Sequence, residues 1–485
     1  MNEVISTISG LVWSPVLVYL CLGTGLYFSV RTRFMQLRGL GDMIRLMVQG
    51  RATSSGISSF QAMTMTLSVR VGTGNIAGVA TAIAFGGPGA MFWMWVVAFL
   101  GASTACVEST LAQIYKEKDE RGHYRGGPAY YIEKGTGWRW YAWLFAGVTV
   151  IAAGLLLPGV QANSIAAGLR NAWGVPSWAT AALLSVSLAF IIFGGVKRIA
   201  RFTQVVVPFM AIAYMLVAAV IMVLNAERLP DMFMLIVRSA FGLDAAFGAM
   251  IGVAVQWGVK RGIYSNEAGQ GSGAHAAAAA EVSHPAKQGY VQAFSVYIDT
   301  LLVCSATAFV ILSSGMYNVI APDQTWIVQA LPGVEVGPGF AQHAVEATLP
   351  GWGKGFIALA LLFFAFTTLL AYYYMAETNM AYINRGSSRR WPLFALRLGV
   401  IGAVIYGTIK TTASAWELGD IGVGLMAWLN IVAIFILQKP ALRALKDYEE
   451  QRRAGADPSF DPVRLGIAGA SVWRRGDRAV EQAGQ

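Results

Sequence analysis

Long apolar stretches, separated by short charged segments, constrain this chain more than any other feature of its sequence. Each stretch runs for about 18–25 residues, the length that crosses the hydrocarbon core of a bilayer as a helix. Charged residues make up only 13% of the 485 residues, and 56% are hydrophobic. A soluble domain is typically about 25% charged. The sequence therefore predicts an all-α membrane protein.

Hydropathy predicts about eleven membrane-spanning helices. We place them at 11–30, 60–85, 88–115, 140–170, 177–194, 202–225, 241–265, 289–314, 351–381, 391–408 and 418–438. Arginine and lysine are frequent in the loops 31–51 and 116–139, whereas the loop 315–350 contains neither. Because cytoplasmic loops retain Lys and Arg, we expect a multi-pass inner-membrane protein with its N-terminus outside and its C-terminus in the cytoplasm.

Composition argues against several other classes of protein. Lys and Arg exceed Asp and Glu by 36 to 26, which in a membrane protein indicates contact with anionic lipid headgroups rather than nucleic acid. The three cysteines lie in apolar stretches and imply neither disulfides nor a metal cluster. The four histidines form no H-E-x-x-H pair. We expect no enzyme activity, no cofactor and, from the absence of a basic n-region, no cleavable signal peptide.

Two of the predicted spans contain glycines and polar residues near their middle. The first interruption is 68–78, which includes Gly72, Gly74 and Asn75, and the second is 247–258, which includes three glycines. Every backbone N–H and C=O needs a partner in hydrocarbon, so an interrupted helix persists only where it lines a cavity. The alternative is that these glycines only let helices pack closely.

The interrupted segments open two consecutive groups of five helices. Since five is odd, the two groups have opposite orientations, as in a transporter built from an inverted repeat. We therefore expect an extra N-terminal helix and basic loop (1–58), two repeats (59–225 and 226–438), and a tail (439–485) that forms a surface helix followed by disorder. A helix break offers N–H groups to a carboxylate and carbonyl groups to Na⁺ or an ammonium group. This favours a small zwitterion and a cation as substrates.

Several motifs resemble the signature of the alanine or glycine:cation symporter family. They are SFQA at 59–62, RVGTGNIAGVA at 70–80, GGPGA at 86–90, ESTLAQ at 108–113, RGGPAYY at 125–131, KRGIYSNEAG at 260–269 and FAFTT at 364–368. The resemblance covers residues 10–440. It implies a leucine-transporter-like fold with a 5+5 inverted repeat and two broken helices. It also implies symport of alanine, glycine or a related amino acid with Na⁺, or with H⁺ in some members.

The resemblance also implies which residues bind the substrates. The positions that match the substrate site are Thr73, Gly74, Asn75, Gln161, Phe247, Met250, Thr368 and Tyr372. Among these, Thr73, Gly74 and Asn75 are expected to receive the carboxylate, and Phe247 and Met250 to form a small side-chain pocket. The positions that match the cation site are the carbonyls of Ser68 and Val71 and the hydroxyls of Thr367 and Thr368. Oxygen ligands of this kind suit a hard cation such as Na⁺.

The sequence leaves some alternatives open. Tyr372 stands where the family usually has a tryptophan, which leaves room for glutamine or another polar amino acid. A channel, the remote alternative, would show a ring of repeated polar residues along a pore instead of two helix breaks. The oligomeric state is left open.

Four intramembrane charges also allow more than one role. Arg70 could form a gate with an acidic residue or extend to the membrane surface, and Glu108 could be its partner or a structural hydrogen-bond acceptor. Asp299 could bind a cation or proton, or form an interhelical hydrogen bond. We expect Glu267 in the cytoplasmic linker that follows the second broken helix.

Overall fold

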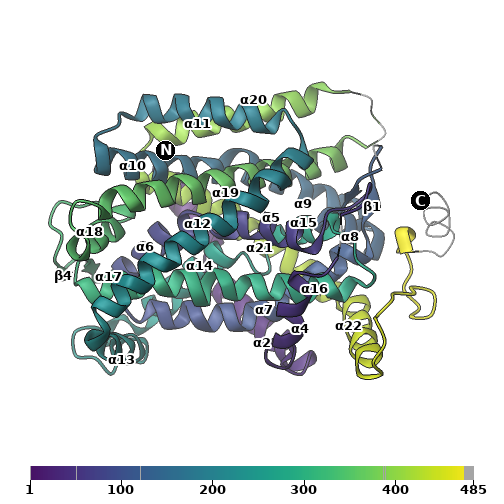
Figure 1. Ribbon diagram of the computed structural model, residues 1–485, viewed down its shortest axis with the longest axis horizontal. Coiled ribbons are helices and arrows are strands. Elements are labelled where there is room, and N and C mark those ends of the chain that lie inside the picture. Colours follow the sequence, from purple (N-terminus) through teal and green to yellow (C-terminus); the bar gives the residue numbers. More distant parts are fainter. Residues whose placement is uncertain (1, 51, 121, 386, 388, 474–485) are drawn as a thin grey trace.

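The computed structural model describes residues 2–50, 52–120, 122–385, 387 and 389–473, and these residues form a bundle of helices (Figure 1). The α-helices are α1 (Asn2–Val12), α2 (Pro15–Arg31), α3 (Met35–Arg38), α4 (Leu40–Met47), α5 (Ser59–Arg70), α6 (Val79–Gly86), α7 (Ala90–Ile114), α8 (Pro128–Thr136), α9 (Arg139–Ile151), α10 (Leu157–Trp173), α11 (Ser177–Ile192), α12 (Val196–Leu224), α13 (Leu229–Ala240), α14 (Ile251–Asn266), α15 (Ser272–Ala279), α16 (Pro285–Val296), α17 (Ser305–Ser314), α18 (Pro338–Thr348), α19 (Gly353–Ile383), α20 (Trp391–Ile409), α21 (Thr412–Ile436) and α22 (Gln438–Arg453).

The remaining elements are short. The 3₁₀ turns are η3 (Ala226–Arg228), η4 (Gly248–Met250) and η6 (Ser471–Trp473), and the π-helical segments are η1 (Gly74–Gly78), η2 (Ala152–Leu156) and η5 (Tyr297–Cys304). Two antiparallel hairpins pair β1 (Glu117–Lys118) with β2 (Tyr124–Arg125) and β3 (Asn318–Ile320) with β4 (Trp326–Gln329). In Figure 1 these hairpins lie at opposite ends of the bundle.

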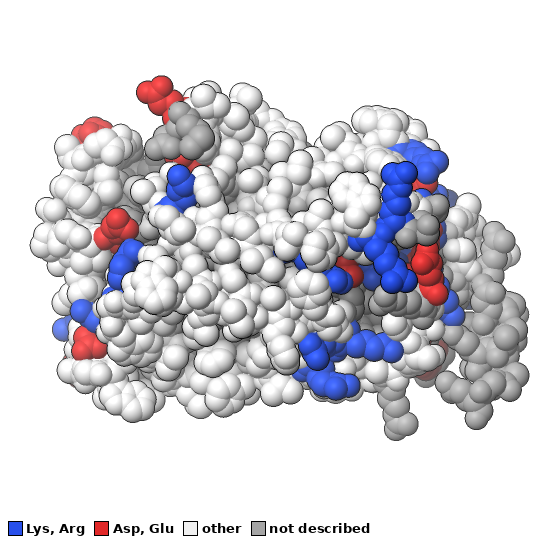
Figure 2. Space-filling view, turned by 90° about the horizontal axis from the view of Figure 1, so that it is seen from above, with Lys and Arg blue, Asp and Glu red and all other residues white. Residues whose placement is uncertain are grey.

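Eight helical segments are long and apolar enough to cross a membrane, and they coincide with eight of the eleven predicted spans. The other three predicted spans coincide with the interrupted segment α5–α6 and with the shorter helices α11 and α14. Figure 2 shows a broad band without Lys, Arg, Asp or Glu between charged residues that gather toward both ends of the visible face. The prediction of an all-α, multi-pass membrane protein is confirmed, whereas the number of eleven spans stays a prediction.

The first predicted interruption is confirmed. Helix α5 ends at Arg70, residues 71 and 72 leave the helical path, and the chain continues through Thr73 as η1 and α6. Asn75 and Arg70 are both fully or almost fully buried, so the break lies inside the bundle rather than at a membrane surface.

The predicted position of the second interruption is wrong. Residues 248–250 form a single 3₁₀ turn, and α14 then runs without a break through Gly258 to Asn266. A Cβ atom at Gly258 would lie 2.5 Å from the carbonyl oxygen of Ala90, so this glycine permits close packing of α14 against α7. The break lies instead at 267–271, between α14 and α15.

Backbone conformation explains why the chain breaks at 267–271. Glu267, Gly269 and Gly271 all have positive φ angles, of 54°, 89° and 81°. A left-handed residue directly after a helix ends it, and glycine adopts this conformation without a steric penalty. By contrast, Gly252 and Gly258, which belong to the predicted interruption but lie within α14, do not have positive φ angles.

Three π-helical segments occur in helices that surround the two breaks. One is η1 itself, the second is η2 between α9 and α10, and the third is η5 between α16 and α17. Each contains a locally widened turn, a feature that is rare and often found at functional sites.

The tail beyond α22 is ordered through residue 473, so the expected disorder after the surface helix is wrong for the described part. Phe460, Ile467 and Trp473 are buried at the end of the bundle that carries α8. The indole N–H of Trp473 donates to the carbonyl oxygen of Gln113 at 2.8 Å. Residues 474–485 lie outside the described residues.

Candidate functional site

The first break is held by side chains from two other helices. The amide N–H of Thr73 donates to Gln161 Oε1 of α10 at 3.1 Å. On the other side of the break, the hydroxyl of Thr368 in α19 donates to the carbonyl oxygen of Ser68 at 2.7 Å. Between them, a Cβ atom at Gly72 would lie 2.5 Å from Thr368 Oγ1, so only glycine leaves room for this arrangement.

Each break is also braced by a polar side chain. Asn75 Oδ1 accepts from the amide N–H of Gly72 at 2.9 Å. In the second break, Glu108 Oε2 of α7 accepts from the amide N–H of Gly271 at 3.1 Å and from Asn430 Nδ2 at 2.8 Å. Glu108 therefore acts as a hydrogen-bond acceptor that holds backbone, one of the two roles that the sequence allowed.

The two breaks lie directly against each other. A Cβ atom at Gly74 would lie 3.1 Å from the Cα atom of Ser265, the last residue but one of α14. Asp299 connects the two elements, because its carboxylate accepts from Asn75 Nδ2 at 2.6 Å and from Ser265 Oγ at 2.9 Å. Thr300 Oγ1 adds a third donor at 2.6 Å. Asp299 thus makes the interhelical hydrogen bonds that were one of its expected roles.

Side chains close the space between the breaks from the α19 side. The hydroxyl of Tyr372 donates to Glu267 Oε1 at 3.2 Å, and Gln161 lies next to the same hydroxyl. Because Gln161 also accepts from Thr73, these four residues connect the first break to the second through α10 and α19.

Buried polar atoms without a partner gather at this junction. Within the part of the chain that the structure describes, such atoms at the breaks include Thr73 Oγ1, Tyr264 Oη, Glu267 Oε2, Ser272 Oγ and Trp416 Nε1. Buried polar groups are costly unless they form hydrogen bonds. A cluster of them, with both donors and acceptors, is the arrangement expected for a polar ligand that supplies the missing partners.

Aromatic rings limit the size of the ligand. The rings of Tyr264 and Trp416 lie 4.9 Å apart. Trp416 also reaches the first break, since a Cβ atom at Gly78 would lie 3.7 Å from the far edge of its indole ring. A space bordered by these rings and two helix breaks suits a small side chain.

Arg70 is buried, so the expectation that it could extend to the membrane surface is wrong. Its guanidinium donates to the carbonyl oxygen of Gln292 at 2.9 Å and to the hydroxyl of Ser295. Glu108, Glu267 and Asp299 all interact with it electrostatically, but no carboxylate among the described residues forms an ion pair with it.

The structure brings most of the predicted site residues together. Those at the junction are Ser68, Val71, Thr73, Gly74, Asn75, Gln161, Thr368 and Tyr372. The hydroxyl of Thr367 donates to Phe364 O of its own helix at 2.9 Å. Phe247 and Met250 are not at the junction. They contact Gly87, and α14 separates them from the second break by 16 residues, or about 24 Å of helix.

Sequence reasoning missed three residues of the junction, namely Tyr264, Glu267 and Trp416. Glu267 was expected in a cytoplasmic linker but is only 1% exposed and lies within the second break. The signal that could have found it is the run Glu-Ala-Gly-Gln-Gly at 267–271, which places an acidic residue beside two glycines after a long apolar helix.

A cavity of about 530 Å³ beside the junction is lined by charged residues. Arg261 of α14 donates to both carboxylate oxygens of Asp420 of α21, at 2.9 and 3.0 Å, and Lys260 approaches Asp420 at 2.7 Å. These three residues line the cavity together with Trp257 and Trp416. Trp416 therefore borders both this cavity and the junction.

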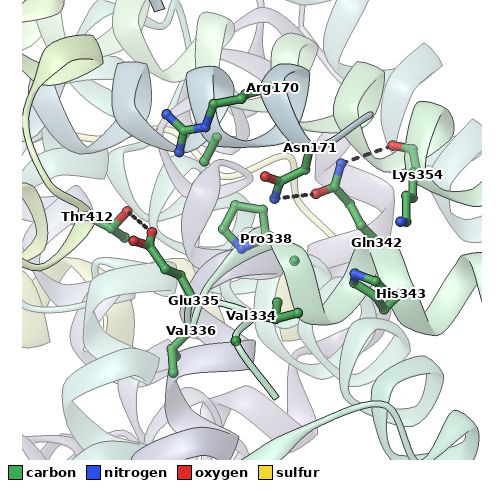
Figure 3. Close-up of a pocket in the computed structure, with 13 residues that line it drawn as sticks. Arg170, Asn171, Val334, Glu335, Val336, Pro338, Gln342, His343, Lys354 and Thr412 are labelled. Carbon is green, nitrogen blue, oxygen red and sulfur yellow. Dashed lines mark hydrogen bonds between the residues drawn. The ribbon is translucent and has the colours of Figure 1, made fainter. Parts of the chain in front are cut away.

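A second cavity, of about 270 Å³, lies beside the first and shares Glu335 and Thr412 with it. Figure 3 shows the polar side chains that line it, with Thr412 bonded to Glu335 and Asn171 to Gln342. No residue of either break lines this second cavity, so we do not assign the transport site to it.

Comparison with known proteins gives a family match over nearly the whole chain. Residues 1–462 match the model of the sodium:alanine symporter family. The chain is 60% identical to the putative sodium/proton-dependent alanine carrier protein YrbD of Bacillus subtilis, over 98% of both chains. It is 52% identical to the sodium/proton-dependent alanine carrier protein of Bacillus sp. (strain PS3), over 91% of this chain and 99% of the relative. The probable sodium/glutamine symporter GlnT of Bacillus subtilis is 42% identical, over 95% and 93%.

Proposed function

Because the chain belongs to the sodium:alanine symporter family, we propose that it imports alanine, or a related small amino acid, together with Na⁺ by alternating access. The observation that carries this proposal is the junction of two abutting helix breaks, bordered by buried polar atoms that lack partners. A transporter with an inverted repeat binds its substrate at such a junction. Two relatives, 60% and 52% identical to the chain, are named as alanine carriers, and the relative named for glutamine is 42% identical.

The proposed substrate site places the carboxylate of the amino acid at the first break. The N–H groups of Thr73 and Gly74 lie where the helix resumes, and a helix N-terminus favours an anion. Gln161 accepts from Thr73 in this structure, so we infer that its amide turns to the substrate when the carboxylate takes the Thr73 N–H. Tyr264 and Trp416 then border the side chain of the amino acid.

The proposed Na⁺ site lies between α5 and α19. The carbonyl of Ser68 and the hydroxyl of Thr368 already meet there at 2.7 Å, and the carbonyl of Val71 and the hydroxyl of Thr367 complete the predicted oxygen ligands. Because Na⁺ would join α5 to α19, it stabilises the same break that receives the carboxylate. The two ligands are then coupled, since each favours the conformation that binds the other.

Uptake by proteoliposomes tests the proposed function. We expect labelled alanine to accumulate when an inward Na⁺ gradient is imposed and to be displaced by unlabelled glycine. A parallel assay with an inward proton gradient and no Na⁺ distinguishes the two coupling ions named for the relatives. Stronger displacement by glutamine than by glycine would favour a polar amino acid as substrate, and no accumulation under either gradient would contradict symport.

Removing the Thr368 hydroxyl should weaken the response to Na⁺. Thr368→Val keeps the shape of the side chain but removes the oxygen that reaches Ser68. We expect the Na⁺ concentration for half-maximal uptake to rise about tenfold, which corresponds to ~1.4 kcal/mol for one lost polar contact. Thr367→Val should have a smaller effect, because the Thr367 hydroxyl bonds only within its own helix.

A matched control is Thr180→Val in α11. Thr180 is buried, and α11 does not contribute to the junction. This variant should leave the Na⁺ dependence of uptake unchanged. If Thr368→Val also leaves it unchanged, the cation binds elsewhere.

A further inference from the structure

We propose that Glu267 binds the ammonium group of the transported amino acid, an assignment that rests on the proposed function. Glu267 directly follows α14, and its side chain is buried within the second break. Its φ angle of 54° is one that residues other than glycine seldom adopt, and such strained conformations are concentrated at functional sites.

The two oxygens of the Glu267 carboxylate differ in their hydrogen bonding. Oε1 accepts from the hydroxyl of Tyr372, whereas Oε2 accepts no hydrogen bond of normal geometry among the residues that the structure describes, although the hydroxyl of Ser272 lies close to the carboxylate. A carboxylate has about four acceptor positions, and leaving a buried one unpaired is costly. A hydrogen-bond donor to Oε2 would therefore stabilise the site, and a positively charged donor compensates the buried charge best.

The neighbouring positive charge does not fill this role. Arg70 donates to the carbonyl oxygen of Gln292 and to Ser295, and it forms no ion pair with Glu267. Asp299, another carboxylate of this buried group, accepts from Asn75, Ser265 and Thr300. Glu108 also has an oxygen without a partner, Oε1, but its Oε2 is held by Gly271 and Asn430, whereas Glu267 contacts Tyr372 between the two breaks.

The surroundings of Glu267 match the chemistry of an ammonium group. An ammonium has three N–H donors and no acceptor. The hydroxyl of Ser272 interacts with Glu267, and that of Tyr264 with Thr73, so each of these hydroxyl oxygens can still accept a hydrogen bond. Glu267 and hydroxyl groups of this kind together offer enough acceptors for all three donors.

The same arrangement separates the two ends of a zwitterion. The carboxylate of the amino acid is attracted by the helix N-terminus at Gly74 and repelled by Glu267. Because Gly74 packs directly against Ser265, two residues before Glu267, a molecule as small as alanine reaches both breaks. An amino acid in this orientation draws the two broken helices together, which a ligand without an amino group does not.

Binding of alanine and of lactate to the purified full-length protein tests this assignment. Lactate has the shape of alanine but carries a hydroxyl in place of the ammonium group. At saturating Na⁺, we expect Glu267→Gln to weaken alanine binding about 10- to 100-fold, the range for a hydrogen bond to a charged group. We also expect the preference for alanine over lactate to collapse, which a purely structural role of Glu267 would not cause.

The control variants separate folding from recognition. Glu227→Gln removes a carboxylate from the loop after α12 and should leave both affinities unchanged. Glu267→Asp keeps the charge but shortens the side chain, so the preference for alanine over lactate should fall without disappearing. The Na⁺-induced rise in melting temperature, measured without alanine, should persist in Glu267→Gln and shows that the variant is folded. If Glu267→Gln does not fold, the ratio of alanine affinity to lactate affinity is measured in Glu267→Asp and in Tyr372→Phe instead. An unchanged ratio in both variants rejects the assignment.

The remaining outcomes are distinguishable. If the wild-type protein binds no alanine, the proposed function fails, whatever Glu267 does. If it binds alanine and Glu267→Gln retains the wild-type preference over lactate, the function stands and the ammonium assignment is rejected. If Glu267→Gln loses the Na⁺-induced rise in melting temperature but still recognises alanine, Glu267 binds the cation instead. If only Glu108→Gln loses the preference for alanine over lactate, the ammonium group binds at Glu108.

Discussion

Gly72→Ala should abolish Na⁺-driven uptake while leaving the protein folded. A Cβ atom at this position would lie 2.5 Å from Thr368 Oγ1 and 3.1 Å from Gln161 Oε1. Thr368 cannot rotate away freely, because a β-branched side chain has few χ1 conformations. The added methyl group would therefore break the hydrogen bond from Thr368 to the Ser68 carbonyl and the one from the Thr73 N–H to Gln161. Both proposed binding sites would be disturbed at once.

The measurement is uptake of labelled alanine into proteoliposomes, together with a melting temperature for the purified variant. Gly402→Ala in α20 is a matched control, since a Cβ atom there meets nothing within 4 Å. It should transport normally and confirm that alanine in a helix is tolerated, with a stability change of about 1 kcal/mol or less. Normal uptake by Gly72→Ala would show that the contacts at Gly72 do not matter for transport.

Asp420→Asn should cause a severe loss of stability. Asp420 is 2% exposed and pairs with both Arg261 and Lys260. Removing its charge leaves two cations without a partner, one of them almost fully buried. Breaking a buried ion pair in this way costs about 3–5 kcal/mol. Denaturant unfolding of the purified protein measures the change in the free energy of unfolding.

Two further variants identify the cause of that loss. Asp457→Asn removes a carboxylate that is 81% exposed and pairs with Lys287, so it should cost less than about 1 kcal/mol. Arg261→Met combined with Asp420→Leu removes both partners and should recover much of the stability, because no buried charge of that pair is left alone. A double variant as unstable as the single one would mean that packing, rather than unpaired charge, explains the loss.

Hydropathy predicts the membrane helices well, because the requirement for apolar residues in a bilayer acts on each helix separately. The position of the second break could not be derived in this way. Gly258 has the same composition signal as Gly72, but it packs against the carbonyl of Ala90 and leaves α14 intact. Whether a glycine permits a break or a close contact depends on its neighbour in space, which one sequence does not reveal.

This dependence on neighbours in space also explains which candidate site residues could be predicted from the sequence. Ser68, Thr73, Gln161, Thr368 and Tyr372 follow from motifs, and the structure brings them together.

Tyr264 and Trp416 carried no comparable signal, because aromatic residues are frequent at membrane interfaces and their pairing across α14 and α21 depends on the fold. The burial of the tail also depends on contacts between residues that are far apart in the sequence. Trp473 bonds to Gln113, 360 positions earlier in the chain.

The three π-helical segments have a consequence for the evolution of this protein. A π-helical turn holds about one residue more than an α-helical turn, so each segment is equivalent to one residue inserted into a regular helix. Each residue rotates a helix by about 100°. Deleting one residue from η2 would therefore turn Gln161, five positions beyond its end, away from Thr73 without changing any side chain. In lineages that lost such an insertion, the substrates recognised would change by rotation of a helix rather than by substitution of its residues.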